Sequence, residues 1–504
     1  MRFRFLVLAA VFAFGGLLGW LLSNASVSTP MVAAQATTKD KPITGTIKAP
    51  FGEINLEKGL PATELDSKKL YDELDFQRAC QTYLWALPLV SFAEWQHQHE
   101  TVFGAKDGQL VEYDLYKDRL GILTANATTP YTIAFGNLAR TGPMILDVPE
   151  GPLAGQFSDF WQRGVGEVGE SALEKGNPAK YLILGPGQDK AKIEGYRVVR
   201  MPTNNFMIGV RSLEPDMEKS KVLMAKLALY PFANRDKPPA NKLISPEGKE
   251  WNQGQPRGLA YWQRLHAILQ EEPVEPRDRM MMAMLVPLGI EKGKPFTPDE
   301  RQKKILIQGA EIGELMAMNF SFHKRFEGIR YRPDTAWVYA LRMKSPSQED
   351  EHFTQLDHRT AWFYEAVTSS KGMLTTTPGE GQAYLGAYHD KAGKWFDGGK
   401  TYRLRVPPDP PAKQFWSWTL YDTRTRCLII NKQGIADRSS RMDLKKNADG
   451  SIDLYMGPTA PEGLEKNWIP TNPDQAWFAY FRLFAPLKPY FDQSWLLPDI
   501  EMVK

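Results

Sequence analysis

The chain has 504 residues, more than one ordinary hydrophobic core accommodates, so we expect two or three domains. Its 42% apolar and 24% charged content is typical of a globular protein and excludes an intrinsically disordered one. The formal net charge of +3, without a basic stripe, argues against a nucleic-acid-binding protein. Aromatic residues at 12%, with 37 prolines and 40 glycines, favour substantial β structure.

The first residues are typical of a targeting segment. Arg2 and Arg4 precede an apolar run over residues 6–22, and Ala34-Gln35-Ala36 fits a cleavage site, so residues 1–36 are predicted to be a signal peptide. Because the run is near the lower limit for crossing a bilayer, an uncleaved N-terminal anchor is the alternative. The two arginines are the only charges of this segment, so its removal changes the net charge from +3 to +1. We expect membrane contact only through residues 6–22, if they are retained.

Residues 37–104 are predicted to form an extended lead-in and a helix. Asp66 or Ser67 can cap the helix, and apolar residues then recur three or four positions apart. Pro88 is expected to kink or end the helix, which then resumes toward His99.

Residues 105–230 are predicted to form a first, antiparallel β module. Its strand candidates are residues 132–135, 144–148, 156–162, 180–184 and 196–200. Alternation places Phe157, Asp159, Trp161 and Arg163 on one face, which predicts a strongly polar patch.

Residues 231–383 are predicted to be a proline-rich loop followed by a helical section. Thr297-Pro298-Asp299-Glu300 is typical of a helix start, with Thr297 as N-cap and Pro298 at the first helical position. A further helix is expected over residues 351–367.

Residues 384–504 are predicted to form a second β module, a sandwich or jelly roll. Its strands are expected near residues 402–406, 415–420, 426–431, 452–456 and 477–484. Asp422 and Arg426 flank the turn at residues 423–425, and the ordinary interpretation is a satisfied ion pair at the end of a buried strand. The alternative is a polar cluster at the rim of a pocket.

Arg482 is the most informative side chain of this second module. Alternation places it on one strand face with Tyr480 and the phenylalanines on either side, and a guanidinium among rings needs an anion, a carbonyl or a ring face. A structural pair with Asp422 or Glu465 is the favoured interpretation. Binding of a substrate carboxylate or sulfate is the alternative.

Two stretches of the chain carry a family resemblance. Residues 447–501, which include NADGSIDLYMGP and SWLLPDIE, resemble the C-terminal module known as domain of unknown function 1214. Residues 83–211, with the markers YLWALPLV, NATTPY, TGPMILDVP and YLILGPG, resemble its usual N-terminal companion, domain of unknown function 1254. The linking stretch LDHRTAWFYEAVTSSKGM fits the same pair. The resemblance implies two mostly β modules joined by helices, export to the periplasm or cell surface of a Gram-negative bacterium, and no settled activity.

One position departs from the family pattern. The family usually has Asn-x-Asp-Thr-x-Tyr where this chain has NATTPY at residues 126–131. The carboxylate is therefore missing at Thr128, which puts an acid or metal role there in doubt.

Motifs for cofactors are weak. The glycines at positions 164, 166 and 169 match a dinucleotide-binding pattern but lack the βαβ setting that it needs, so no nucleotide is expected and the cofactor is unknown. No H-E-x-x-H and no paired C-x-x-C occurs, and no metal ligand is assigned. Cys80 and Cys427 are expected to be buried small hydrophobes, and the sequence does not show whether they meet. A homo-oligomer is compatible with the sequence.

The predicted fold is α+β, mostly β, with two antiparallel β-sandwich-like modules joined by helices. The predicted function is to bind, and in one version to hydrolyse or otherwise process, a small polar or anionic organic molecule in a cleft associated with the modules. A non-enzymatic envelope structural or interaction protein is the alternative, and whether the protein is an enzyme stays open.

The predicted site combines polar and aromatic residues set within otherwise apolar strands and turns, where unpaired polar groups are costly. The catalytic candidates are Asp159 or Asp422 as general base and Arg163 or Arg482 as stabiliser of negative charge. The ligand-binding candidates are Asn126, Tyr131, Trp161, Tyr384, Trp416, Arg426 and Asn467.

Overall fold

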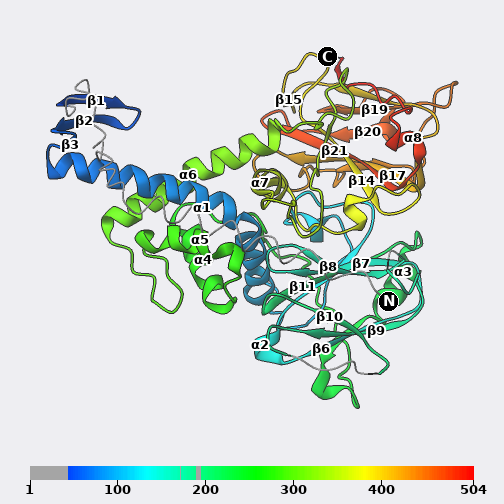
Figure 1. The fold of residues 1–504 in the computed structure, drawn as a ribbon. Helices are drawn as coiled ribbons and strands as arrows, with labels where there is room; N and C mark the ends of the chain where they lie inside the picture. Colours follow the sequence, from blue (N-terminus) through cyan, green and yellow to red (C-terminus); the bar gives the residue numbers. More distant parts are fainter. Residues whose placement is uncertain (1–43, 171, 189–193, 504) are drawn as a thin grey trace, which may run out of the picture. The chain divides into compact units, whose positions relative to one another are not determined.

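The computed structural model describes residues 44–170, 172–188 and 194–503 (Figure 1). The predicted signal peptide or anchor therefore lies outside the described residues. Contacts divide the chain into a first unit that ends at Glu73 and a second unit, Leu74–Lys504. No helix in the described ranges combines the length and the apolar character that a membrane crossing requires.

The first unit contains a small antiparallel sheet and the start of a helix. The sheet consists of β1 (Gly45–Ala49), β2 (Gly52–Glu57) and β3 (Leu60–Pro61). Helix α1 (Glu64–Thr101) begins just after it. The buried Asp66 accepts hydrogen bonds from the Asn55 amide and the Thr63 hydroxyl, which fix the first turn.

Helix α1 continues through Pro88, where a kink or an end was predicted. Proline cannot donate to the carbonyl one turn earlier and crowds that carbonyl. Here the carbonyls of Leu84 and Trp85 accept instead from Thr360 and Arg359 of helix α7 (Leu356–Glu365). Tertiary partners thus replace the lost intrahelical bond, and the helix persists.

The first β module consists of two sheets around a common core. The larger has the order β4 (Val111–Tyr113), β5 (Tyr131–Asn137), β11 (Asn205–Ser212), β7 (Leu153–Asp159), β8 (Gly164–Gly169). The smaller has the order β10 (Arg197–Arg200), β9 (Ala179–Leu184), β6 (Met144–Val148), β12 (Ala228–Pro231). Side chains from both sheets, including Leu146, Phe157, Ile183 and Ile208, form one apolar cluster. Short helices α2 (Leu138–Thr141) and α3 (Met217–Met224) belong to this module.

The second β module is also built from two sheets. One has the order β13 (Val338–Tyr339), β14 (Gln382–Ala387), β21 (Ala476–Pro486), β17 (Ala412–Asp422), β18 (Asp437–Ser439), with β15 (Phe396–Asp397) also paired to β21. The other has the order β20 (Trp468–Pro470), β19 (Ile452–Gly457), β16 (Tyr402–Val406), β22 (Glu501–Met502). Helix α8 (Lys488–Phe491) follows β21. The predicted strand at residues 426–431 makes only isolated bridges, at Cys427 and Leu428.

The predicted α+β class with two antiparallel β modules is confirmed. Two strand pairs, β9–β10 and β19–β20, are parallel. No sheet closes into a barrel within the described ranges. The predicted domain boundaries stay a prediction.

The helical section contains α4 (Leu259–Glu271), α5 (Arg279–Leu285), α6 (Glu300–Phe322) and α7. Asp299, and not the predicted Thr297, caps α6, because its carboxylate accepts from the Gln302 amide while the Gln302 side chain bonds back to the Asp299 amide. Gly309 and Gly313 let α6 approach α1 closely. A Cβ at Gly309 would lie 2.4 Å from the Cβ of Ala79.

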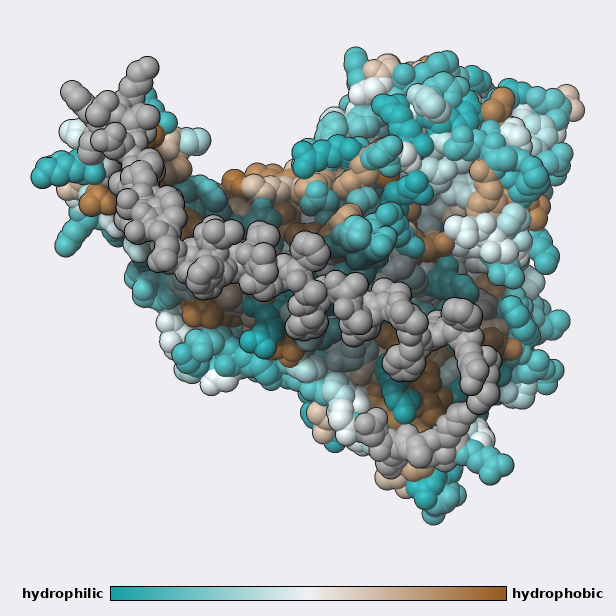
Figure 2. Space-filling model, in the orientation of Figure 1, coloured by the Kyte–Doolittle hydropathy of each residue, from teal (hydrophilic) through white to brown (hydrophobic). Residues whose placement is uncertain are grey.

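The opposite side of α6 exposes apolar side chains, and Figure 2 shows hydrophobic residues gathered along this helix. Ile307, Ile312, Leu315 and Met316 are between 36% and 53% exposed. Single exposed apolar residues are ordinary, but a helical strip of them is a candidate contact surface.

The contact between α1 and α6 yields a stability test. Gly309→Val should destabilise the protein by about 1–3 kcal/mol, because the new side chain meets Ala79 and backbone atoms that cannot move aside cheaply. Urea unfolding of the full-length protein measures the change. Gln308→Val places the same residue at the exposed neighbouring position and should change stability little. Equal effects of the two substitutions would contradict the close packing.

Candidate ligand-binding cavity

A cavity of about 1310 Å³ is lined by residues of both β modules. The first module contributes β5, β7, β8, β9, β10 and β11, and the second contributes β14, β17, β21 and the segment after α7. The charged side chains of the lining are mainly positive: seven are basic and three are acidic. The basic residues are Lys175, Arg197, Arg200, Arg211, Lys371, Lys413 and Arg482, and the acidic ones are Glu167, Glu170 and Glu380.

The register of the larger sheet in the second module explains why polar side chains gather on one side. Tyr384 of β14, Arg482 of β21 and Ser417 of β17 are direct cross-strand neighbours, so they share a face. The next row on this face holds Tyr480 and Thr419. The alternate positions, including Leu483, Phe481, Trp416 and Trp418, form the opposite, apolar face.

Arg482 is the buried charge of this polar face. Its side chain is 4% exposed and lines the cavity. It donates from Nη1 to the Tyr421 hydroxyl and from Nη2 to the Thr124 carbonyl at 2.7 Å. Its guanidinium lies 5.1–5.6 Å from the ring centres of Tyr384, Tyr421 and Tyr480. The structure thus supplies the carbonyl and ring contacts that the sequence predicted.

The predicted ion pair between Arg482 and Asp422 or Glu465 is wrong. Asp422 accepts instead from the amides of Arg424 and Thr425, and Glu465 accepts from the Gly463 amide. Within the described ranges no carboxylate forms an ion pair with Arg482. Burial lowers the pKa of Arg482, but Tyr421 and other tyrosines raise it, and the net shift is upward. The side chain therefore stays charged without a carboxylate beside it.

A second guanidinium faces the same cavity from the first module. Arg211 of β11 lies 5.2 Å from the ring centre of Tyr131 and 5.9 Å from that of Phe484. It donates to Gln382 Oε1 at 3.4 Å, and the same oxygen accepts from the Tyr384 hydroxyl at 2.8 Å. No carboxylate of the described residues pairs with Arg211 either.

Asp437 is a buried carboxylate that the sequence analysis missed. Thr128 donates to it from Oγ1 at 2.9 Å, and it pairs across the sheet with Thr419. Burial raises the pKa of Asp437, while Thr128 and nearby arginines, including Arg119 and Arg482, lower it. The position where the family usually has an acid is therefore in contact with a carboxylate from β18. The only sequence signal for Asp437 is its place in the polar run at residues 437–441.

Four of the predicted site residues come together at this cavity: Asn126, Tyr131, Tyr384 and Arg482. The Tyr131 hydroxyl accepts a hydrogen bond from the backbone amide of Asn126 at 3.0 Å, so each residue positions the other. The other candidates do not line it, and their predicted roles stay predictions.

In the first module, the remaining candidates form part of a buried ion-pair network. Arg163 bonds to the fully buried Asp159 and to Glu275. Trp161 packs against Trp85, with ring centres 4.8 Å apart. These contacts are those of structural residues.

The remaining candidates of the second module also have structural partners. Trp416 stacks on Phe481 on the apolar face of the sheet. Arg426 lies over the Tyr364 ring at 4.3 Å. Asn467 bonds to the backbone of Lys445.

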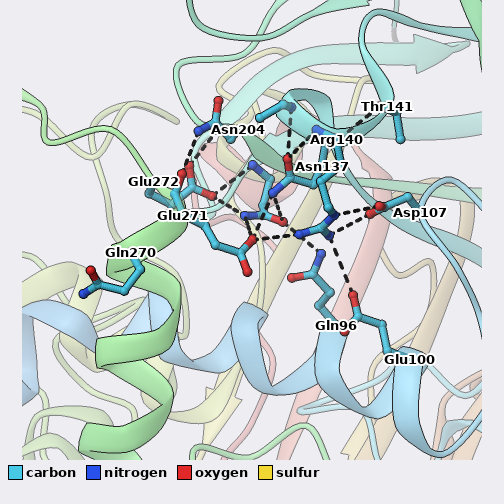
Figure 3. Close-up of polar contacts among 12 residues, drawn as sticks. Gln96, Glu100, Asp107, Asn137, Arg140, Thr141, Asn204, Gln270, Glu271 and Glu272 are labelled. Carbon is cyan, nitrogen blue, oxygen red and sulfur yellow. Dashed lines mark hydrogen bonds and ion pairs between the residues drawn. The ribbon is translucent and has the colours of Figure 1, made fainter. Parts of the chain in front are cut away.

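Arg140, an arginine outside this cavity, has carboxylate partners (Figure 3). Arg140 bonds to Asp107 at 2.9 Å and to Glu271 at 3.0 Å, with Glu100 at 3.9 Å. These residues border a smaller pocket of about 590 Å³. The carboxylate surroundings of Arg140 contrast with the neutral surroundings of Arg482.

Metal and thiol chemistry gain no support from the geometry. Among the described residues, no group of three or more His, Cys, Asp or Glu side chains is placed to hold a metal ion. Cys80 and Cys427 are buried, and burial raises the pKa of the Cys427 thiol to about 12. Both are the buried small hydrophobes that the sequence predicted.

Comparison with family models identifies both modules. The model described as Protein of unknown function (DUF1254) matches residues 110–231, and the model described as Protein of unknown function (DUF1214) matches residues 381–488. The two matches lie in the order that the sequence resemblance predicted, with DUF1254 before DUF1214.

Two solved structures are similar to the chain, and the first of them shares its fold. The crystal structure of the VPA0106 protein from Vibrio parahaemolyticus is 15% identical with a TM-score of 0.55, over 85% of this chain and 100% of that chain. An uncharacterized protein from Burkholderia cenocepacia is 12% identical with a TM-score of 0.41, over 88% of this chain and 91% of that chain. No curated protein matches the chain.

The network of Figure 3 yields a pH prediction through Glu272, which accepts from the backbone amides of Asn204 and Asn205. Burial raises the pKa of Glu272 to about 7. In the window between about 4.3, the ordinary glutamate value, and about 7, the folded state binds more protons than the unfolded state. Stability from this group is therefore lost as pH rises through that window.

Glu272→Gln removes this titration. The stability of wild type relative to the variant should fall by about 1–3 kcal/mol between pH 5 and pH 8. Urea unfolding at the two pH values measures it. Glu271→Gln, at the neighbouring and more exposed carboxylate, controls for lost hydrogen bonds. A difference between wild type and Glu272→Gln that does not change with pH would contradict the assignment.

Proposed function

We propose that the protein binds a small organic anion in the 1310 Å³ cavity, with Arg482 as its main charge anchor. The observation that carries this proposal is a cavity-lining guanidinium, 4% exposed, whose hydrogen-bond acceptors are a hydroxyl and a carbonyl. A guanidinium has five N–H donors, and two of them have acceptors here. Charge-assisted bonds from the remaining donors are among the strongest that a ligand can gain.

The surroundings favour an anion over a neutral ligand. Basic side chains outnumber acidic ones in the cavity lining, and a cleft lined by one sign of charge attracts the opposite sign.

The body of the ligand would be organic. Trp95, Ile133, Trp362 and Phe484 line the same cavity, and its volume exceeds what an inorganic ion fills. Apolar walls with a few placed polar groups are the usual composition of small-molecule sites.

Binding is the part of the predicted function that the geometry supports. The predicted general bases Asp159 and Asp422 lie outside the cavity lining and bond to Arg163 and to the turn at residues 424–425. Hydrolysis remains a prediction from the sequence alone.

Export also belongs to the proposal. Its support is the basic start, the apolar run at residues 6–22 and the small-residue site before residue 37. Cell fractionation with N-terminal sequencing tests it, and a full-length cytoplasmic protein would overturn it.

The second candidate function is a non-enzymatic envelope structural or interaction protein. The apolar strip on α6 favours it, because such strips mark contact surfaces. This candidate predicts that no organic anion stabilises the protein, so the experiment on Arg482 separates the two functions.

The test uses benzoate, hexanoate and sulfate with the full-length protein. At least one organic anion should raise the melting temperature of wild type in proportion to the logarithm of its concentration, because it binds the folded state. Arg482→Met should abolish the rise and Arg482→Lys should weaken it, since lysine lacks the planar fork of donors.

The control is Arg359→Met. Arg359 is fully buried, donates to the Trp85 carbonyl and does not line the cavity. Its replacement should lower the melting temperature but leave the anion-dependent rise unchanged. An anion response that survives in Arg482→Met, or that disappears equally in Arg359→Met, would contradict the proposed anchor.

A further inference from the structure

Two guanidiniums from different modules approach the same tyrosine in the cavity wall. Arg482 of β21 lies 5.6 Å from the ring centre of Tyr384. Arg211 of β11 shares with the Tyr384 hydroxyl one acceptor, Gln382 Oε1. Burial raises the pKa of Tyr384 to about 12, and both Arg211 and Arg482 act to lower it. Both charges therefore lie near one side chain.

The sheet register separates the two charges. Arg211 lies over Phe484, and Phe484 follows Arg482 by two positions on the same strand face. The two guanidiniums therefore lie beside neighbouring positions of one strand face. Two neighbouring anchors suit two anionic groups joined by a spacer.

Neither anchor has a carboxylate partner among the described residues. Arg211 has a single hydrogen bond, at 3.4 Å, and Arg482 has two, all to neutral groups. Arg482 lowers the pKa of Asp437, but Arg119 and Arg438 also lower it, and no ion pair joins Asp437 to Arg482 in the described ranges. The cavity thus presents two positive charges with no carboxylate bound to either.

We propose that the ligand is an organic dianion of the dicarboxylate class, with one carboxylate on Arg482, the other on Arg211, and an apolar spacer against the aromatic wall. The inference rests on the proposed anion site and deepens it. It requires residues from both modules, so only the assembled pair of modules would recognise the second carboxylate.

The test compares dicarboxylates from succinate to pimelate with monocarboxylates of the same carbon number, by calorimetric titration of the full-length protein. The best dicarboxylate should bind about tenfold to a hundredfold more tightly than its monocarboxylate, because it adds one set of charge-assisted bonds. Arg211→Met should reduce dicarboxylate affinity to the monocarboxylate level and leave the monocarboxylate unchanged. Arg211→Gln, which keeps polarity at the half-buried position, should do the same.

Arg441→Met is the matched control. Arg441 lies 4.1 Å from the ring centre of Phe415, which stacks on Phe484, so the control removes an equal charge from the neighbouring ring of the same stack. It does not line the cavity and should leave the dicarboxylate preference intact.

The outcomes separate the two proposals. Equal binding of mono- and dicarboxylates, or a dicarboxylate affinity that Arg211→Met leaves unchanged, would overturn the dianion and leave the anion site standing. A loss of monocarboxylate binding in Arg211→Met would also overturn it, because both arginines would then hold one anion. Absence of binding by every carboxylate would overturn the anion site and the dianion together.

Discussion

The burial of Arg482 without a carboxylate partner is the constraint on which the arrangement around the cavity depends. A buried charge is costly unless other groups replace the water that it loses. Three tyrosine rings and the Tyr421 hydroxyl do so from the second module, and the Thr124 carbonyl does so from the first. Tyr421 in turn donates to the Ala125 carbonyl, so the contacts that compensate Arg482 also join the two modules.

The two faces of the β14–β21–β17 sheet have different roles: one forms the core and the other lines the cavity. One face of the β14–β21–β17 strands supplies tryptophan, phenylalanine and leucine to the core of the sandwich. The other face presents tyrosine, serine and arginine, and the first module and the helices cover it. Burial of both faces lets a guanidinium lie in a site of low polarity, where each hydrogen bond to a ligand is stronger than in water.

The sequence predicted the fold well where periodicity was clear. Strands β5, β6, β7, β9 and β10 of the first module, strands β16, β17, β19 and β21 of the second, and helix α1 follow from apolar spacing. Local sequence patterns did not predict the structure where contacts with other residues determine it. Asp299 caps α6 in place of Thr297 because Gln302 completes a reciprocal pair. Helix α1 does not end at Pro88, one of the two outcomes predicted there, because α7 supplies donors to carbonyls near the proline.

The site was predictable only in part, for the same reason. Arg482, Tyr384, Tyr131 and Asn126 stood out as polar or aromatic residues within apolar strands and turns, and they meet at the cavity. Asp159 and Arg163 carried an equally strong local pattern, yet they satisfy each other in the core. Arg211 and Asp437 were missed because their significance lies in contacts across modules, with Phe484 and Thr128 respectively.

The central claim is that Arg482 holds an anion in this cavity. A crystal structure of the full-length protein soaked with 4-bromobenzoate, with anomalous data collected at the bromine edge, tests it most directly. The account predicts a bromine peak in the cavity with the carboxylate bonded to Arg482. Bromine found only outside the cavity, with Arg482 still bonded to Tyr421 and Thr124 alone, would contradict it.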